Sequence, residues 1–544
     1  MQSTISETRM ADSQEQRSMP PVRCLEVATL AFIVMASVMM ATAIYTAFNL
    51  SAVVSYTRDI WHHLAVYSEL IASPFHAMNP HVATDDPSRS YSPWTVIMAL
   101  LARAGGLDAT GAIAISAILS TFIILLGIFL FSREYLRNAW APALFLLIFF
   151  GSWGQVVNHT GFHTVATFMY SASYPFAIVL GMGFILWWMV LKSLNATPLQ
   201  VAFFIVIFIP ISASLFITHQ LQGLFAVGAT IAFALFAGKA SLLRRLILAG
   251  SLLVGLFVSQ YWWYFDPIAY VLNPEVRGGH SAPRMFGYST ENISVVFVTL
   301  GAALLGVAGL FNKHTGRVRL ELALPLLVIV LAFTFLLVNG NWVSTRFLPF
   351  IALFLQIGLV TYLLQRSAVP GRLSNALNGA IIGALLVGFG FNALKGYENY
   401  QKSRIFIETG QIEIQYATWN RSILAASEFA ETLVPAGATV IAHRDVAFPM
   451  EATSLAVVAI PRLFALVPDM FERQSSNNAF FDDATSRQTR CSILAQYDVQ
   501  MIVYRPFWLS DAVETQLQAF GTAQVYGDLT FIPAETGHFS ACPS

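Results

Sequence analysis

Residues 56–71 read YTRDIWHHLAVYSELI, and they follow directly on the first long apolar run of the chain. An acid, Asp59, stands near the start of this stretch, before the aromatic and imidazole side chains of residues 61–63. Apolar residues then recur at helical spacing, at Ile60, Leu64, Tyr67 (or Ala65), Leu70 and Ile71. We therefore expect an amphipathic helix at a membrane surface, with a carboxylate at its start.

The composition surrounding this stretch is that of a membrane protein. Apolar residues make up 56% of the 544 residues and charged residues 11%, whereas soluble domains carry about 25% charged residues. Successive apolar windows of about 20 residues match the hydrocarbon core of a bilayer. The chain is therefore predicted to be an α-helical polytopic membrane protein. Its formal net charge of zero gives no reason to expect a nucleic-acid partner.

The apolar windows predict about eleven transmembrane helices. They cover residues 25–50, 110–131, 139–153, 174–191, 199–218, 220–238, 246–265, 294–311, 320–338, 347–364 and 377–394. The run 94–104 is too short to cross a bilayer and is expected to be interfacial or re-entrant. Residues 1–24 lack the apolar core of a removable signal and are expected to form a disordered cytoplasmic tail.

Basic residues alternate between the predicted loops. With the tail inside, one set of loops carries Arg133, Arg137, Lys192, Lys239, Arg244, Arg245, Lys313, Arg317, Arg319, Arg366 and Arg372. The positive-inside rule therefore places these loops in the cytoplasm. The first outer loop, residues 51–92, then lies outside, as does everything after the transmembrane domain of residues 25–394. We expect the inner membrane of a bacterium, with a periplasmic C-terminus.

Residues 395–544 differ in character from the spans, because charges become frequent. Short β-like runs at 438–442 and 499–504 are separated by helical patterns at 422–433 and 511–520. These patterns predict a soluble α/β domain of ordinary size. Two of the three cysteines, Cys491 and Cys542, fall in it. They could pair in an oxidising compartment or remain reduced.

Ionisable residues gather at the predicted outer ends of the helices and are rare within the spans. They are Asp59, His62, His63, Glu69, His159, His163, His219, Asp266, Arg277, His280, Arg284 and Arg346. A carboxylate among arginines and histidines suits transfer from an anionic, phosphate-linked donor to a hydroxyl group. The acid would take the acceptor's proton, and guanidinium groups would hold the phosphate.

Simpler roles remain open for these residues. Asp59 could pair with Arg58 or cap its helix, and His62 and His63 could be merely interfacial. Arg346 could extend to the lipid headgroups. A metal could bind His159 and His163 if that segment is helical, but no acidic third ligand is near, and no metal site is predicted.

The chain resembles the GT-C superfamily of polytopic glycosyltransferases, which use polyprenyl-phosphate-linked sugars. Asp59 matches the position of the acid that members carry in the first outer loop, although the second acid of many relatives is replaced here by Ile60. Residues 344–350, STRFLPF, look like the segment that opens a late span in the mannosyl- and aminoarabinose-transferase branch. Residues 493–504 are similar to a helix-to-strand segment of the soluble domain in such proteins.

This resemblance implies a glycosyltransferase that moves a sugar from a polyprenyl-phosphate donor to a glycan or glycolipid acceptor of the cell envelope. It implies no cofactor, since a divalent metal serves only some branches. The residues assigned are Asp59 as catalytic base, Arg346, Arg284 and Arg277 for the donor phosphate, and Trp61, His62, His63, Glu69, His163 and His280 for substrate.

Three other functions compete with this one. A flippase or transporter of lipid-linked glycans would need charged residues in mid-span, and few are present. A polymerase or ligase of the O-antigen type would depend on arginine and histidine in large outer loops, as at Arg277, His280 and Arg284. A scaffolding membrane protein with an external binding domain is not excluded. The early Asp59 and the soluble tail favour the glycosyltransferase.

Overall fold

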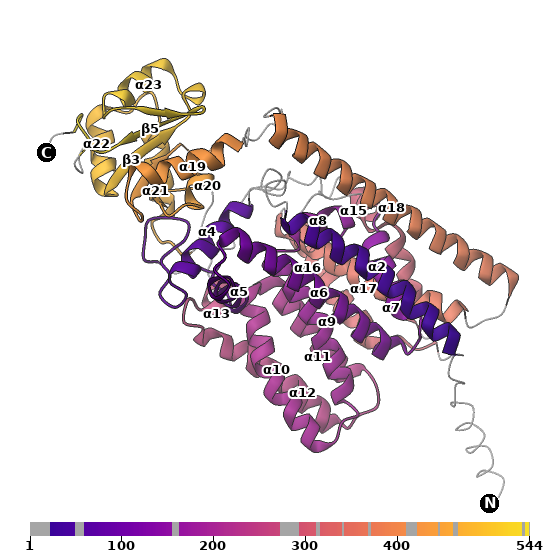
Figure 1. The fold of residues 1–544 in the computed structure, drawn as a ribbon. Helices are drawn as coiled ribbons and strands as arrows, with labels where there is room; N and C mark the ends of the chain where they lie inside the picture. Colours follow the sequence, from indigo (N-terminus) through magenta and orange to yellow (C-terminus); the bar gives the residue numbers. More distant parts are fainter. Residues whose placement is uncertain are drawn as a thin grey trace, which may run out of the picture.

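The computed structural model is a bundle of helices with a small α/β domain at one end (Figure 1). It describes residues 22–48, 59–86, 88–154, 161, 163–272, 293–311, 316–339, 342–367, 371–409, 421–443, 446–460, 466–535 and 539–542. This arrangement confirms the predicted fold class of a polytopic helical protein with a C-terminal domain that contains a sheet.

The helices of the bundle follow one another from Val22 to Thr409. They are α2 (Val22–Phe48), α4 (Asp59–Ala72), α5 (Pro93–Ala104), α6 (Ala109–Leu136), α7 (Ala141–Gly151), α8 (Val165–Ser171), α9 (Pro175–Ser193), α10 (Pro198–Thr218), α11 (Gln220–Phe236), α12 (Leu242–Val258), η1 (Ser259–Tyr261), α13 (Pro267–Leu272), α15 (Ile293–Leu300), η2 (Gly301–Leu310), α16 (Leu320–Val338), η3 (Trp342–Phe347), α17 (Leu348–Ser367) and α18 (Arg372–Thr409).

Nine helices in the described part of the chain are long and apolar enough to cross a membrane. All eleven predicted spans fall on helices, but two of them coincide with the shorter helices α7 and α11. The last helix, α18, continues to Thr409, fifteen residues past the predicted end at 394. Lys395 and Glu398 form an ion pair (2.7 Å) within this extension, so the change in composition there does not end the helix.

The core of the bundle is aromatic and tightly packed. Phe131, Phe184 and Trp187 are fully buried, and their rings meet edge to face or stacked at centroid separations of 5.3–6.1 Å. Helices α6 and α9 approach each other closely at Gly127 and Gly181, where a Cβ on Gly127 would lie 2.6 Å from the Gly181 carbonyl oxygen. Small residues at such crossings let helix backbones pack closely in a membrane.

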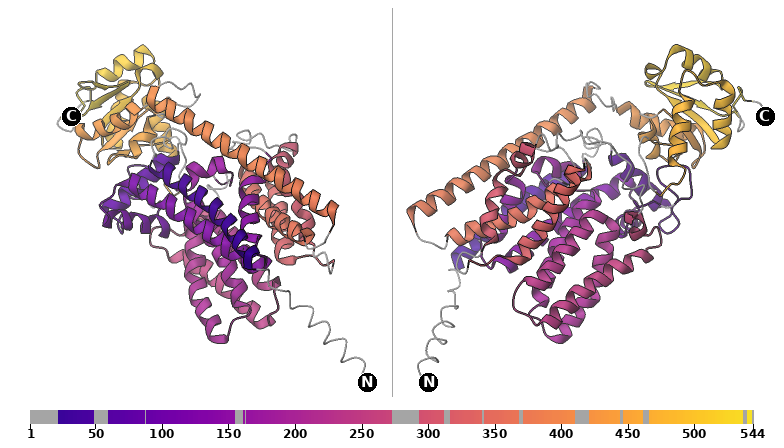
Figure 2. Two further views of the ribbon diagram at one scale, coloured as in Figure 1. Left: turned by 45° about the vertical axis from the view of Figure 1, so that its right-hand side comes forward. Right: turned by 180° about the vertical axis from the view of Figure 1, so that it is seen from behind.

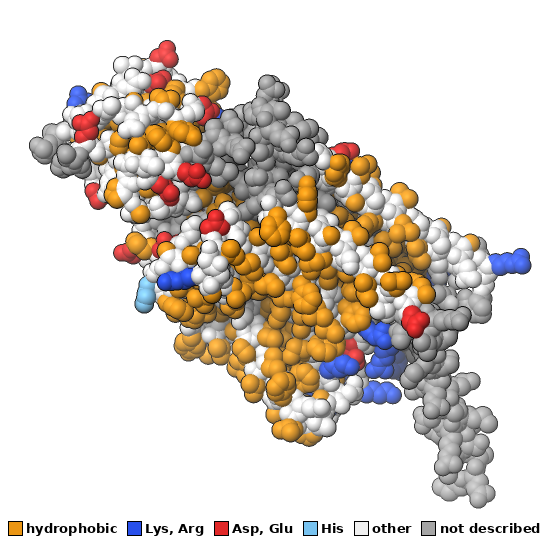
Figure 3. All heavy atoms as spheres, viewed as in Figure 1, with side chains coloured by type: hydrophobic (Ala, Val, Ile, Leu, Met, Phe, Trp, Pro, Cys, Tyr) orange, Lys and Arg blue, Asp and Glu red, His pale blue; other side chains and the backbone are white. Residues whose placement is uncertain are grey.

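One end of the bundle is tied together by the basic residues that the charge pattern placed in common loops. Lys192 on α9 pairs with Glu134 on α6 (2.6 Å), and Arg244 on α12 donates to the Leu194 carbonyl (2.9 Å). In the space-filling view, lysine and arginine gather at the end of the bundle near the N-terminus, away from the C-terminal domain (Figure 3). The agreement supports a common side for these loops.

The C-terminal domain is built on a five-stranded mixed sheet of order β2-β1-β3-β5-β4. The strands are β1 (Thr439–Ala442), β2 (Ala456–Val457), β3 (Val499–Tyr504), β4 (Gln524–Tyr526) and β5 (Leu529–Pro533). The helices are α19 (Arg421–Leu433), α20 (Ala447–Glu451), α21 (Met470–Phe480), α22 (Arg487–Gln496), η4 (Pro506–Trp508) and α23 (Asp511–Gln518).

Several predicted features of this domain are present. Strand β1 is parallel to both β2 and β3, whereas β3, β5 and β4 are antiparallel to one another in turn. The predicted helix-to-strand segment at 493–504 is the end of α22 followed by β3, with Asp498 turning the chain at φ 47°. Cys491 and Cys542 form a disulfide, with their Cα atoms 5.4 Å apart. The sequence had left open whether these two cysteines pair or remain reduced.

Candidate functional site

The end of the bundle away from the basic loops is formed by α4, the loop of residues 73–92, α5, α13, η3 and the turn between α10 and α11. Trp262 donates from its indole nitrogen to the Tyr91 carbonyl (2.7 Å), and the Tyr264 hydroxyl donates to the Pro74 carbonyl (2.7 Å). These bonds fix the first outer loop to the segment after α12. Two ribbon views from other sides place the C-terminal domain at this same end (Figure 2).

The positive charges of two arginines act on one histidine at this end. His219 joins α10 to α11 and accepts from the Gln222 backbone N–H through Nδ1 (3.4 Å). Burial is the main cause that lowers the pKa of His219, the positive charges of Arg346 and Arg89 add to it, and together they bring the pKa to about 3. The imidazole is therefore neutral at pH 7 and adds no charge to that of the two guanidinium groups.

Each arginine is held by a different element. Arg89 lies in the loop before α5, is exposed, and donates to the Tyr270 hydroxyl of α13 (2.6 Å). Arg346 lies in η3, half-buried, just before α17 begins at Leu348. Guanidinium groups beside neutral imidazole and phenol donors make a set that binds phosphate oxygens well. This arginine–histidine cluster of Arg89, Arg346 and His219 is the candidate site.

The sequence pointed to Arg346 in this cluster but not to Arg89. Arg89 follows Asp85 and Asp86 in the first outer loop, so it looked like one charge in a mixed segment. The available signal was its place in an outer loop, where basic residues are uncommon. His219 was noted among the outer-face ionisable residues, but its sequence neighbours gave it no role.

Helix α4 exists as predicted, and most of its side chains are buried by other parts of the chain. It packs against α5, α6 and α20, and Ile60, Trp61, Val66 and Tyr67 are all at most 2% exposed. Burial raises the pKa of the Tyr67 hydroxyl to about 12. The C-terminal domain covers part of this helix, and the position of α4 at a membrane surface stays a prediction.

The polar side of α4 meets an acid of the C-terminal domain. His62 Nδ1 lies 2.6 Å from Glu451 Oε1, and His81 Nδ1 lies 3.0 Å from Glu451 Oε2. The two imidazole rings are 5.0 Å apart and nearly perpendicular. All three side chains are buried. This histidine–glutamate cluster of His62, His81 and Glu451 joins the first outer loop to α20.

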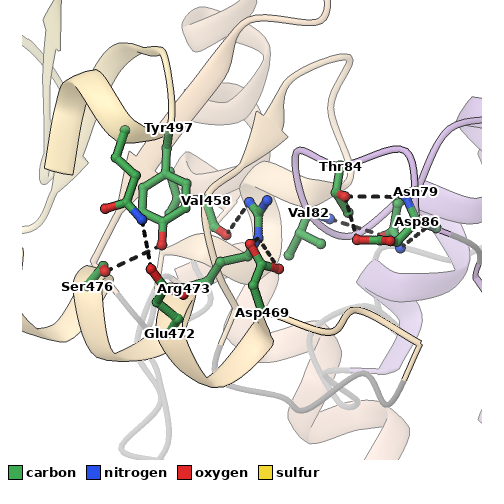
Figure 4. Close-up of polar contacts among 11 residues, drawn as sticks. Asn79, Val82, Thr84, Asp86, Val458, Asp469, Glu472, Arg473, Ser476 and Tyr497 are labelled. Carbon is green, nitrogen blue, oxygen red and sulfur yellow. Dashed lines mark hydrogen bonds and ion pairs between the residues drawn. The ribbon is translucent and has the colours of Figure 1, made fainter.

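The loop that carries His81 is folded by its own hydrogen bonds (Figure 4). Asn79 Oδ1 accepts from the backbone N–H groups of His81 (3.0 Å) and Val82 (3.3 Å). Asn79 Nδ2 donates to the Asp86 carbonyl (3.2 Å), and the Thr84 hydroxyl donates to the Asp86 carboxylate (2.7 Å). The imidazole of His81 therefore projects from a rigid base.

In the C-terminal domain, Arg473 occupies the region beside this loop (Figure 4). Arg473 pairs with Asp469 (2.8 Å), donates to the Val458 carbonyl (3.5 Å) and lies 5.1 Å from the centroid of the Tyr497 ring. The backbone N–H of Ala83 donates to the Val457 carbonyl (2.8 Å), which joins the loop to the edge of the sheet. The two parts of the molecule are thus in direct contact.

The other residues predicted for substrate lie in different surroundings. The ring of His63 is 4.5 Å from that of Tyr174 at the start of α9, and Glu69 accepts from the Met78 backbone N–H (3.0 Å). His163 is 2% exposed and stacks on Phe149 at 4.7 Å, and burial lowers its pKa to about 3. Trp61 is buried within α4. Their substrate roles stay predictions.

Four further residues of the predicted site cannot be placed by their side chains. Asp59 is the first residue of α4, but its side chain lies outside the described residues. Arg277, His280 and Arg284 fall in the segment 273–292, also outside the described residues. The start of α4 nevertheless puts Asp59 one helical turn from His62 and His63.

The comparisons with known proteins identify the fold. No family model matches the sequence, and no curated protein sequence is significantly similar to it. Among solved structures, the neighbours are polytopic membrane glycosyltransferases of the GT-C type. The chain therefore has the GT-C fold, as the sequence resemblance predicted.

Particular neighbours show how far this likeness extends. The Archaeoglobus fulgidus oligosaccharyltransferase is 13% identical, with a TM-score of 0.52 over 92% of this chain and 74% of that protein. The arabinofuranosyltransferase AftD from Mycobacteria is 14% identical, with a TM-score of 0.56 over 95% of this chain but only 40% of that longer protein. ArnT from Cupriavidus metallidurans is 14% identical, with a TM-score of 0.49 over 92% of this chain and 98% of the other.

Proposed function

We propose that this protein is a membrane glycosyltransferase that moves a sugar from a polyprenyl-phosphate donor to a hydroxyl group of a cell-envelope glycan or glycolipid. The observation that carries the proposal is the arginine–histidine cluster at the bundle end where α4 begins, in a chain with the GT-C fold. Proteins with the same fold, the oligosaccharyltransferase and AftD, transfer sugars.

In this proposal, Arg346 and Arg89 hold the donor phosphate. Two guanidinium groups offset the charge that develops on the phosphate as it departs. His219 stays neutral beside them, so its imidazole donates or accepts a hydrogen bond without adding charge. The Tyr270 hydroxyl, bonded to Arg89, orients that arginine.

Asp59 is proposed as the base that activates the acceptor. The acceptor hydroxyl attacks the anomeric carbon and passes its proton to the Asp59 carboxylate. The bond from the anomeric carbon to the phosphate oxygen breaks, and polyprenyl phosphate departs with the electron pair. Phosphate is already a good leaving group, so no general acid is required on the donor side.

The proposed location is the inner membrane of a bacterium, with the site and the C-terminal domain on the periplasmic face. The basic loops at the opposite end of the bundle support this orientation. A donor anchored in the bilayer would then present its phosphate at the height where η3 and the α10–α11 turn lie.

The experiment compares Asp59→Asn with Asp85→Asn, an exposed acid of the same outer loop. The full-length protein in lipid nanodiscs is supplied with an extract of lipid-linked sugars, and released polyprenyl phosphate is measured. We expect Asp59→Asn to lower the rate by about 100-fold or more, because general-base catalysis contributes that much, and to bind polyprenyl phosphate as the wild type does.

Asp85→Asn should turn over normally. Undiminished release by Asp59→Asn would remove Asp59 as the base, and absence of polyprenyl-phosphate binding by the wild type would refute the proposed donor class.

A further inference from the structure

We propose that His62, His81 and Glu451 bind one divalent transition-metal ion of the zinc type, which fastens the C-terminal domain to the first outer loop. The three residues each offer a ligand atom, and these atoms all lie within 4.8 Å of one another. The sequence predicted no metal, and this inference does not depend on the proposed sugar transfer.

The spacing of the ligand atoms fits a small metal ion. The Nδ1 atoms of His62 and His81 lie 2.6 and 3.0 Å from the two carboxylate oxygens of Glu451. A tetrahedral ion with bonds of about 2.0–2.1 Å holds its ligand atoms about 3.3 Å apart. The two nitrogen–oxygen distances would have to widen by roughly 0.3–0.7 Å to admit such an ion.

The second coordination shell is partly in place. His81 Nε2 lies 3.2 Å from the Ser90 hydroxyl, so the ring is oriented with Nδ1 toward Glu451. Imidazoles that bind metals use their other nitrogen for such a bond, which fixes the ring and its tautomer. The Asn79 bonds that fold the loop hold the backbone under His81.

The donor set selects the class of metal. Two imidazole nitrogens and one carboxylate suit zinc and its neighbours in the first transition series. Magnesium and calcium prefer sites made wholly of oxygen, so this site discriminates against them. A dication would also offset the charge of the Glu451 carboxylate, which is 2% exposed.

The position of the site gives it a structural role. His62 and His81 come from the first outer loop, whereas Glu451 lies 370 residues after His81 at the end of α20. One ion would therefore bind two parts of the chain that otherwise meet through contacts such as the Ala83–Val457 hydrogen bond. Free energy of metal binding would then stabilise the docked arrangement.

The test uses the full-length protein, purified in detergent, stripped with a chelator and dialysed against zinc chloride. Metal content is measured by mass spectrometry, and docking is followed by the rate at which trypsin releases the C-terminal domain. We expect one zinc per chain and slower release with zinc, and no such protection with magnesium chloride.

The variants Glu451→Gln and His81→Gln should each weaken zinc binding by at least 100-fold. Their matched control is His76→Gln, an exposed histidine of the same loop, which should keep full metal content and protection. Because Glu451→Gln preserves the size of the side chain, it can retain hydrogen bonds within the cluster while losing the ion.

Two results would overturn the proposal. A stripped wild-type protein that takes up no zinc at micromolar concentration would show a cluster held by imidazole–carboxylate hydrogen bonds alone. Equal zinc content in the wild type, Glu451→Gln and His81→Gln would place the ion elsewhere. If a variant fails to fold, the zinc stoichiometry and magnesium comparison of the wild type still decide the question.

Discussion

Arginines at the two ends of the helical bundle are used in different ways. At the basic end, Arg245 donates to the backbone carbonyls of Ala234, Leu235, Ala237, Gly238 and Ala240. At the other end, Arg89 donates to the Tyr270 hydroxyl, and both Arg89 and Arg346 act on the pKa of His219. Arg245 caps the C-terminal end of α11, whereas Arg89 and Arg346 place positive charge near the neutral imidazole of His219.

This difference shows why residue type alone does not define a site. A guanidinium group that satisfies the last carbonyls of α11 stabilises the helix end and complements its dipole. A guanidinium group that donates to a neutral side chain instead contributes a local positive potential that attracts an anion. The three predictions below test this distinction, from the largest expected effect to the smallest.

Replacing Arg346 or Arg89 by alanine should weaken binding of polyprenyl phosphate. Each substitution is expected to raise the dissociation constant about tenfold, and the double variant about 100-fold, because charge-assisted bonds to phosphate each contribute about 1.5–3 kcal/mol. Binding is measured in nanodiscs by quenching of tryptophan fluorescence. The control is Arg103→Ala, an arginine that donates to the carbonyls of Ile71 and Ala72. Equal affinity in the wild type, the two single variants and the double variant would show that the phosphate does not bind at this cluster.

Replacing Arg245 by alanine should lower stability without changing lipid-phosphate affinity. Loss of its bonds to the end of α11 is expected to cost about 2 kcal/mol of the free energy of unfolding, since several carbonyls lose a charged donor but regain water. Thermal unfolding in detergent measures the loss. Arg133→Ala, an exposed arginine at the same end, should change the midpoint little. A weakened affinity for polyprenyl phosphate in Arg245→Ala would contradict the division of roles.

Acid should destabilise the protein through His219. Its pKa is about 3 in the folded state and about 6.5 in an unfolded chain, so the unfolded state binds the extra proton between these values. Stability from this residue is therefore full above pH 7 and falls as the pH drops below about 6.5. Between pH 6.5 and 5.5 the loss should be about 1 kcal/mol.

The variant His219→Asn isolates this effect from that of other histidines. Asparagine can still accept the Gln222 N–H at the start of α11, but it does not titrate. Unfolding midpoints of the two proteins are compared across pH 5 to 8. Identical pH profiles of the wild type and His219→Asn would mean that the imidazole is hydrated and that its pKa is not lowered by folding.

Much of the fold could be predicted from the sequence, because its causes are local. Apolar windows of membrane-spanning length predicted the helices, and short β-branched runs predicted β1 and β3. Arg346 could be predicted as a site residue because it stands two positions before an apolar helix, α17, in a segment with a recognisable order of residues. These features depend on neighbours within a few positions along the chain.

The rest could not be predicted because it depends on distant contacts. Helix α4 has the spacing of a half-exposed helix, and only the docking of α20 shows that its polar side is covered. The pairing of His81 with Glu451 likewise spans 370 residues. Arg89 and His219 both lie in connecting segments, and their proximity follows from the way that α5, α10 and α11 pack.

The hydrogen bond between Ala83 and Val457 has a consequence for how the protein can be divided. Strand β2 stands at the edge of the sheet, and Ala83 takes up its outward carbonyl. A soluble fragment that begins after α18 would leave this edge of the sheet uncovered. Its unpaired backbone groups could then bind a strand of another chain and cause aggregation. A fragment intended for solution studies should therefore carry that part of the first outer loop in a linked form, so that Ala83 still covers the edge of the sheet.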